Sequence, residues 1–222
     1  MAIKFFLVRH GQSEWNLEGR YQGVLNTKLT EEGQEQAGLA AEYLSKVDFA
    51  GFYSSPIGRT IETAEIFKKK LGRDYKISEN LREMNFGKWE GLKFDDIILK
   101  YGTDFQNWIK DPFKNPPTDG ESFNDIIKRG SQEINKIISE NKDDSNILLV
   151  THGGFIVAML VHWLQISPQR WSSIIQNHSA INIVVIDKDI PYISQINFTG
   201  HLFKHYSSST DKIIKNYSKL RK

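Results

Sequence analysis

A short apolar run that ends in Arg-His-Gly constrains this chain more than any other stretch of its sequence. The run is Phe5-Phe6-Leu7-Val8, and Arg9, His10 and Gly11 follow it directly. Consecutive apolar residues are typical of a strand buried on both faces of a sheet, and the glycine allows a sharp turn or the close approach of a ligand. Ligands of open α/β sheets bind at the carboxyl ends of the strands. We therefore expect a guanidinium and an imidazole side by side at a ligand-binding edge.

Two further strand-like runs are followed by a histidine or an arginine. The apolar run at 146–151 is followed by His152, and the run at about 49–54 is followed by a helix with Arg59 in its first turn. A cation at that position opposes the helix dipole, so an anion in front of it would explain its presence. A lone histidine or arginine is more often structural or solvated. The recurrence at three strand ends favours one shared anion site.

Composition excludes several classes of protein. The 222 residues suffice for one domain, and 29 Lys and Arg against 27 Asp and Glu give a net charge of +2. Such a balance provides no bulk attraction to nucleic acid or to a membrane. The chain has no cysteine, which excludes disulfides, thiolate metal sites and a cysteine nucleophile. It begins without a signal-peptide layout, and its apolar runs are too short to span a bilayer. We expect a cytoplasmic globular protein.

The remaining pattern predicts alternating strands and helices. Thr30 is a candidate N-cap for a helix that ends near residue 46. The other expected elements are a loop at 17–27, a helix over about 59–71, short helices at 94–101 and 105–110, a helix at 121–140, a buried helix at 155–164, and an antiparallel pair at 180–186 and 192–198. We interpret about 92–120 as a helical, lid-like insertion within a single domain at 1–206, followed by a basic tail at 207–222. The other histidines, at 162, 178, 201 and 205, lack a comparable setting, so we expect them to be structural or solvated.

Four segments together resemble one family. They are Leu7-Val8-Arg9-His10-Gly11-Gln12-Ser13-Glu14-Trp15-Asn16, Tyr53-Ser54-Ser55-Pro56-Ile57-Gly58-Arg59-Thr60-Ile61-Glu62-Thr63-Ala64, Leu81-Arg82-Glu83 and Val150-Thr151-His152-Gly153-Gly154. The sequence resembles the histidine phosphatase superfamily, in the branch related to cofactor-dependent phosphoglycerate mutase. The resemblance implies an α/β fold of three layers, in which a mixed, mostly parallel sheet has helices on both faces.

The resemblance also implies the role of each site residue. His10 is the nucleophile that carries the phosphoryl group, and Glu83 gives a proton to the leaving oxygen and then acts as base toward water. Arg9, Arg59 and His152 complete the catalytic set and stabilise the charge of the phosphoryl oxygens. The phosphate-binding residues implied are Arg9, Asn16, Gln22, Gly23, Arg59, His152 and Gly153. These cationic groups make a metal unnecessary, so we expect neither a metal nor another cofactor.

The choice within the family rests on two departures from true mutases. Met84 and Phe86 stand where mutases have an arginine and a tyrosine that grip phosphoglycerate, and the segment between Glu83 and His152 lacks the long mutase insertion. We therefore expect a metal-independent hydrolase of small-molecule phosphate monoesters. A phosphoglycerate mutase and a non-catalytic phospho-ligand binding or scaffold protein are the alternatives, and a homodimer stays open. Five large side chains can either line the ester or belong to the core: Met84, Phe86, Trp89, Phe94 and Trp108.

Overall fold

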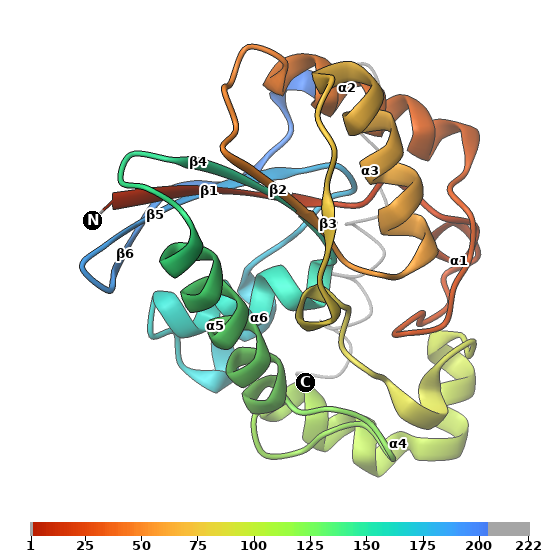
Figure 1. Ribbon diagram of the computed structural model, residues 1–222. Coiled ribbons are helices and arrows are strands. Elements are labelled where there is room, and N and C mark those ends of the chain that lie inside the picture. Colours follow the sequence, from red (N-terminus) through yellow and green to blue (C-terminus); the bar gives the residue numbers. More distant parts are fainter. Residues whose placement is uncertain (1, 204–222) are drawn as a thin grey trace.

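A computed structural model describes residues 2–203, and one six-stranded sheet forms its centre (Figure 1). The strands are β1 (Ala2–Arg9), β2 (Gly51–Ser54), β3 (Lys76–Ile77), β4 (Asn146–Thr151), β5 (Ile181–Asp187) and β6 (Ile190–Phe198). Their order in the sheet is β3-β2-β4-β1-β5-β6. The first four strands of that order are mutually parallel, whereas β5 and β6 run antiparallel to their neighbours. The sheet is mixed and mostly parallel, as expected.

Helices cover both faces of the sheet. They are α1 (Glu14–Glu18), α2 (Glu31–Leu44), α3 (Gly58–Leu71), α4 (Phe94–Lys110), α5 (Phe123–Glu140) and α6 (Gly153–Trp163). In Figure 1, α2 and α3 lie on one side of the strands, α5 and α6 lie on the other, and α4 lies beyond α5 at the foot of the view. Short 3-10 turns occur at Glu79–Leu81, Gly87–Trp89, Pro168–Ser173 and Gly200–Leu202. This arrangement confirms the three-layer expectation.

The continuous apolar run of β1 is explained by burial on both faces. Phe5 and Leu7 belong to the core cluster that also contains the apolar side chains of α5 and α6. Phe6 and Val8 belong to the second cluster, formed with α2 and α3. Successive side chains of a strand point to opposite faces, so a central strand between two helical layers needs an apolar residue at every position.

The helix expected after Thr30 begins at its predicted cap, and a serine caps α5. The side chain of Thr30 accepts a hydrogen bond from the backbone N–H of Gly33 at the start of α2, and Ser122 accepts one from the N–H of Asp125 at the start of α5. The two short helices predicted at 94–101 and 105–110 form one helix, α4, which bends at Tyr101, where φ is −135° and ψ is 29°. The predicted helices are thus the two halves of α4.

The loop expected at 17–27 begins later than the sequence suggested. Residues 14–18 form α1, and Gly19, with φ of 72°, ends that helix. A left-handed residue at this position is what stops a helix, and glycine adopts it without steric cost.

The large side chains that follow Glu83 belong to the core. Met84, Trp89 and Trp108 are fully or almost fully buried in the cluster under α5 and α6, and Phe86 and Phe94 pack against it half-buried. Of the two interpretations left open by the sequence, core packing therefore describes the three most buried side chains. Trp89 and Trp108 each remove about 150–250 Å² of surface from water and so tie the segment around them to the core.

None of the described helices has the length and apolarity that crossing a bilayer requires. The basic tail at 207–222 and His205 lie outside the described residues.

Candidate active site

The parallel strands bring two histidines together at one edge of the sheet. β4 lies between β1 and β2, so the carboxyl ends of all three strands meet there. The backbone N–H of His10 donates to the carbonyl of Thr151 at 3.0 Å, and the ring centroids of His10 and His152 are 5.3 Å apart. Both histidines are buried: the exposed fraction is 2% for His10 and 0% for His152. The convergence expected from the two strand ends is present in the structure.

Hydrogen bonds assign the proton of the His10 ring. Nδ1 lies 2.7 Å from the carbonyl oxygen of Gly11, so it carries the proton and donates it. Nε2 is left with its lone pair, and the Nε–H of Arg59 points to that atom at 3.2 Å. In this tautomer Nε2 is the nitrogen that can attack an electrophile.

Gly11 has a steric role beside this ring. A Cβ at Gly11 would lie 2.1 Å from the carbonyl oxygen of Gly33, so only glycine allows α2 to approach so closely. The glycine after His10 thus serves helix packing rather than the approach of a ligand.

Arg59 is held at the site by backbone carbonyls. It is 1% exposed, and its guanidinium donates to the carbonyls of Gly23 at 2.7 Å and Leu25 at 2.9 Å. These oxygens offset the unfavourable interaction of a cation with the first turn of α3. Gly23, expected to bind phosphate, contributes its carbonyl to Arg59. The loop is fixed in turn by the carboxylate of Glu90, which accepts from the N–H of Leu25 at 3.0 Å.

Arg9 and His152 each keep a buried atom that has no hydrogen-bond partner among the described residues. Arg9 donates from Nη1 to the carbonyl of Gln176 at 2.6 Å, and its Nε is unpaired. Nε2 of His152 is 2.8 Å from Oγ of Ser55, and its Nδ1 is unpaired. Gly153 lies against Arg9, because a Cβ there would be 3.2 Å from Nε. Buried polar atoms are nearly always paired, so unpaired ones beside His10 indicate a place for a ligand.

Two amide side chains near the site are oriented through their oxygens by Ser13 and Thr27. Oδ1 of Asn16 accepts from the backbone N–H of Ser13 at 3.1 Å, Oε1 of Gln22 accepts from the hydroxyl of Thr27 at 3.2 Å, and Oγ of Ser13 lies 2.9 Å from both oxygens. Since both oxygens are turned toward Ser13, the NH₂ groups of the two amides are the atoms left to donate to another partner.

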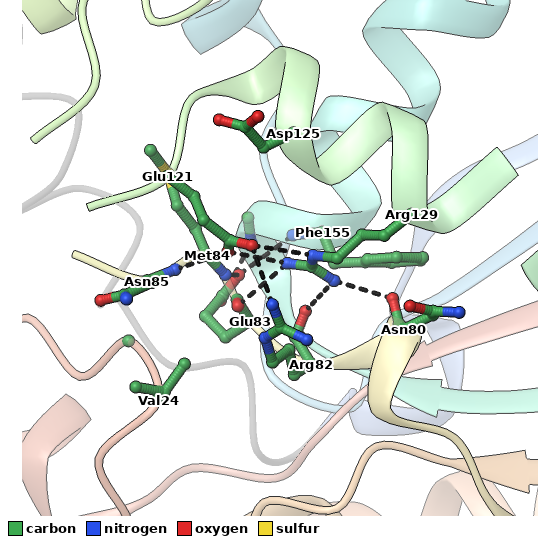
Figure 2. Close-up of polar contacts among 12 residues, drawn as sticks. Val24, Asn80, Arg82, Glu83, Met84, Asn85, Glu121, Asp125, Arg129 and Phe155 are labelled. Atoms are coloured by element: carbon green, nitrogen blue, oxygen red, sulfur yellow. Dashed lines mark hydrogen bonds and ion pairs between the residues drawn. The ribbon is translucent and has the colours of Figure 1, made fainter. Parts of the chain in front are cut away.

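Glu83 binds the amino end of α6 (Figure 2). One carboxylate oxygen accepts from the N–H groups of Met84 at 2.9 Å and Phe155 at 3.0 Å, and the other accepts from Gly154 at 3.1 Å. A negative charge is favoured at a helix N-terminus. The amides at the start of α6 therefore hold the carboxylate of Glu83 in place.

His178 is the site neighbour that the sequence did not indicate. Expected to be structural or solvated, it is 4% exposed, and its ring centroid lies 6.3 Å from that of His10. It precedes β5, which runs antiparallel to β1, so the start of β5 lies at the same edge as the end of β1; Val8 pairs with Ile181. Recognition of the antiparallel pairing between these two strands would have placed His178 here.

Burial and neighbouring cations keep the imidazoles neutral. Burial, and then Arg59 and Arg9, hold the pKa of His10 well below its usual range, and burial followed by Arg59 does the same for His152. Burial, and then Arg9, lowers the pKa of His178. The pKa values of Arg9 and Arg59 fall to about 10 through burial, so both guanidiniums stay charged at neutral pH. A neutral nucleophile beside two cations suits attack on a phosphate dianion.

We expect the protein to lose stability as the pH falls below 6.5, the ordinary pKa of histidine. The buried imidazoles of His10, His152 and His178 stay neutral in the fold, whereas the unfolded chain protonates them near that pH. The unfolded state then binds more protons, so acid favours unfolding. Melting temperatures measured from about pH 8 to about pH 5 test this, with His178→Gln as a variant expected to show a shallower slope. Identical slopes in the variant and the wild type would contradict the expectation, and the exposed His162, replaced by Gln, is the control.

Comparison with known proteins agrees with this geometry. The sequence profile of the histidine phosphatase superfamily (branch 1) matches residues 5–199. The chain is 29% identical to phosphoserine phosphatase 1 of Hydrogenobacter thermophilus, over 92% of this chain and 96% of that protein. It is 34% identical to a 2,3-bisphosphoglycerate-dependent phosphoglycerate mutase of Cytophaga hutchinsonii, over 73% of this chain and 78% of that one.

A solved structure extends the agreement to the fold. A mycobacterial glucosyl-3-phosphoglycerate phosphatase, in a complex with VO₃, superposes with a TM-score of 0.82 at 26% identity, over 88% of this chain and 99% of that one. The match of the family profile over almost the entire sheet and site means that this chain belongs to the histidine phosphatase superfamily, branch 1.

Proposed function

We propose that this phosphoric monoester hydrolase works through a phosphohistidine on His10. In the first step Nε2 of His10 attacks phosphorus, the ester P–O bond breaks, and the carboxyl group of Glu83 gives a proton to the departing alkoxide. In the second step water attacks the phosphohistidine, and Glu83 takes the water's proton. The N–P bond breaks, inorganic phosphate leaves, and both residues return to their starting states.

One observation carries this proposal: a neutral, buried Nε2 lone pair on His10 that faces the Nε–H of Arg59. Arg9 and His152 each add a buried nitrogen, Nε and Nδ1 respectively, that has no hydrogen-bond partner among the described residues. We propose that Arg9, Arg59 and His152 bind the phosphoryl oxygens, where negative charge spreads in the transition state. Asn16, Gln22 and Gly153 are further contacts in the proposal, through two NH₂ groups and the backbone at the start of α6. Gly23 acts there by fixing Arg59.

The proposal assigns the charge stabilisation to guanidiniums, so we expect hydrolysis to be unaffected by a chelator. Arg9 and Arg59 are charged at neutral pH, so they can polarise the phosphoryl group as a metal ion would. Initial rates of p-nitrophenyl phosphate hydrolysis with and without EDTA test this. A strong loss of rate that added divalent metal restores would contradict the metal-free scheme.

The substrate is a small phosphate ester, and we expect hydrolysis rather than isomerisation. Met84, which stands where mutases have a substrate-gripping arginine, is apolar and packs fully buried in the core, so it offers no charge to the carboxylate of phosphoglycerate. The relatives are named for phosphoserine, glucosyl-3-phosphoglycerate and phosphoglycerate, so a screen of esters should begin with these. Release of inorganic phosphate from 3-phosphoglycerate or phosphoserine would support a phosphatase. Efficient isomerisation of 3-phosphoglycerate that depends on bisphosphoglycerate would overturn it, and phosphate binding without turnover would indicate a non-catalytic protein.

The single-domain organisation is likewise our proposal. Both core clusters share the same sheet, and Phe105, Trp108 and Ile109 of α4 belong to the larger of them. A segment tied to the core in this way fits an insertion of one domain better than a domain of its own.

A further inference from the structure

A buried arginine outside the reacting groups binds the backbone that carries Glu83. Arg129 lies in the middle of α5 and is 7% exposed. Its Nη1 donates to the carbonyls of Asn80 at 2.7 Å and Arg82 at 2.8 Å, and its Nη2 donates to the carbonyl of Glu83 at 3.1 Å. Figure 2 shows the guanidinium set against this segment. One side chain thus holds three carbonyls within four residues of the proposed proton donor.

Glu121 completes the arrangement from the start of α5. Its two carboxylate oxygens accept from Nε and Nη2 of Arg129, each at 3.2 Å, and one accepts from the backbone N–H of Asn85 at 2.9 Å. Arg82 donates to the same carboxylate at 3.1 Å. A buried guanidinium is tolerated where it is paired and all its donors are used. Arg129 and Glu121 therefore bind the backbone before and after Glu83: Arg129 binds the carbonyls of residues 80–83, and Glu121 binds the N–H of residue 85.

Two helices thus fix Glu83, one through its side chain and the other through its backbone. The carboxylate is held by the amides of α6, and the backbone is held by Arg129 of α5 (Figure 2). Cζ of Arg129 lies 5.7 Å from the ring centroid of Phe155, the residue whose N–H binds that carboxylate. A Cβ at Gly130 would lie within 2.6 Å of Met159, so this glycine lets the two helices approach closely. Movement of α5 at this point would displace both supports of Glu83.

We propose that Arg129 and Glu121 are positioning residues for proton transfer by Glu83. The inference rests on the proposed function, because it concerns the step in which the leaving oxygen receives its proton. Removing the pair leaves three carbonyls without their donor and lets residues 80–85 shift. A displacement of about 1 Å is enough to cost on the order of 100-fold in a step that depends on alignment. Attack by His10 does not depend on this segment and should be spared.

The test is the dependence of kcat/KM on the leaving group, because kcat/KM reports the steps up to phosphorylation of His10 and excludes the second step, which uses Glu83 as base for every ester. In Arg129→Met, we expect kcat/KM for alkyl phosphates such as phosphoserine to fall by about 10- to 100-fold, and kcat/KM for p-nitrophenyl phosphate to change much less. Nitrophenolate leaves without a proton, so its departure does not need Glu83. Glu121→Gln is the second variant, should Arg129→Met fail to fold. The control is Lys128→Gln, which removes the exposed cation next to Arg129 on α5 and should leave both rates unchanged.

The outcomes separate this inference from the function it rests on. If Glu83→Gln shows the leaving-group effect and folded Arg129→Met and Glu121→Gln do not, the positioning role is wrong and the mechanism stands. Equal losses for both esters would also overturn it, since they would indicate a general structural defect. If Glu83→Gln itself shows no such effect, the role assigned to Glu83 fails first.

A second inference rests on a different observation, the two unpaired nitrogens of His178. Both Nδ1 and Nε2 are buried without a hydrogen-bond partner in the part of the chain that the structure describes. The ring lies beside His10, and Arg9 is the neighbouring charge that acts on it. The backbone N–H of the next residue, Ser179, donates to the carbonyl of His10 at 3.2 Å, which ties this segment to the nucleophile. A buried imidazole with both nitrogens free is costly unless a ligand or water pairs with it.

We infer that His178 donates a hydrogen bond to a phosphoryl oxygen on the Arg9 side of the site. The inference rests on the proposed function, and inhibition by orthovanadate, an analogue of the phosphoryl group, tests it. In His178→Asn and His178→Ala, we expect the inhibition constant for vanadate to rise about tenfold, the equivalent of one hydrogen bond to a charged group. His162→Gln is the control, because His162 is exposed on α6.

An unchanged inhibition constant in folded His178 variants would overturn this role and indicate a packing histidine that holds water. The wild type provides the other check. If vanadate does not inhibit it, the proposed phosphoryl site fails before the assignment of His178 is reached.

Discussion

Replacing His10 with alanine is expected to reduce turnover of phosphate esters by roughly 10⁴-fold or more, the scale on which loss of a covalent nucleophile acts. Its Nε2 lone pair is freed by the Nδ1–H bond to Gly11 and faces Arg59. Burial and the two guanidiniums keep the ring neutral, so the lone pair is available at neutral pH. A methyl group at this position offers no atom that can bond to phosphorus, and water would have to attack the ester directly.

Two measurements should be made on the His10→Ala variant. Steady-state hydrolysis gives the loss of kcat, and rapid acid- and base-quenched reactions with a ³²P-labelled ester report the acid-labile phosphoryl label, which should be absent. The matched control is His162→Ala, which removes an exposed histidine on α6 and should keep both activity and label. A label that survives in His10→Ala would show that another residue is the nucleophile.

The second large effect is expected in Glu83→Gln. Alkyl esters should lose about 10²- to 10⁴-fold in kcat/KM, the range of general acid–base catalysis, whereas p-nitrophenyl phosphate should lose much less in kcat/KM, which excludes the later attack of water. The amide of glutamine cannot give its proton to an alkoxide. The N–H groups of Met84, Gly154 and Phe155 donate to both carboxylate oxygens, and glutamine offers them only one accepting oxygen, so a small shift of the loop is also expected.

Glu83→Ala distinguishes the lost proton from that shift. If both variants show the same dependence on the leaving group, the proton is the cause. Glu140→Gln is the control, because Glu140 is an exposed carboxylate at the last residue of α5. Equal losses for both kinds of ester in Glu83→Gln would exclude Glu83 as the acid.

The sequence predicted the order of the strands and helices well because their signals are local. Continuous apolar runs mark β1 and β4, as only strands between two helical layers need an apolar residue at every position. Thr30 and Ser122 mark the starts of α2 and α5 through hydrogen bonds that span three residues. α1 was missed, since five residues give no periodicity to read.

The sequence could predict which residues of the candidate site come together as far as it could predict where the strands end. Since β1, β2 and β4 are parallel, the residues after them had to meet at one edge, and His10, Arg59 and His152 do. The partners of each side chain were not predictable. The amides of α6 bind the carboxylate of Glu83, and Gly23 binds Arg59 through its carbonyl. Such contacts join residues far apart in the chain, and no local pattern encodes them.

The amino-acid sequence alone indicated the residues to which we assign the chemistry and the strand ends that deliver them to one edge. Only the tertiary structure decided that β5 pairs antiparallel with β1, which places His178 beside His10, and that Arg129 of α5 binds the backbone of Glu83. The physical reason is the range of the interactions. Strand and helix preferences act over a few residues, whereas the pairing of strands and the choice of partner for a buried cation are settled by how the finished layers pack.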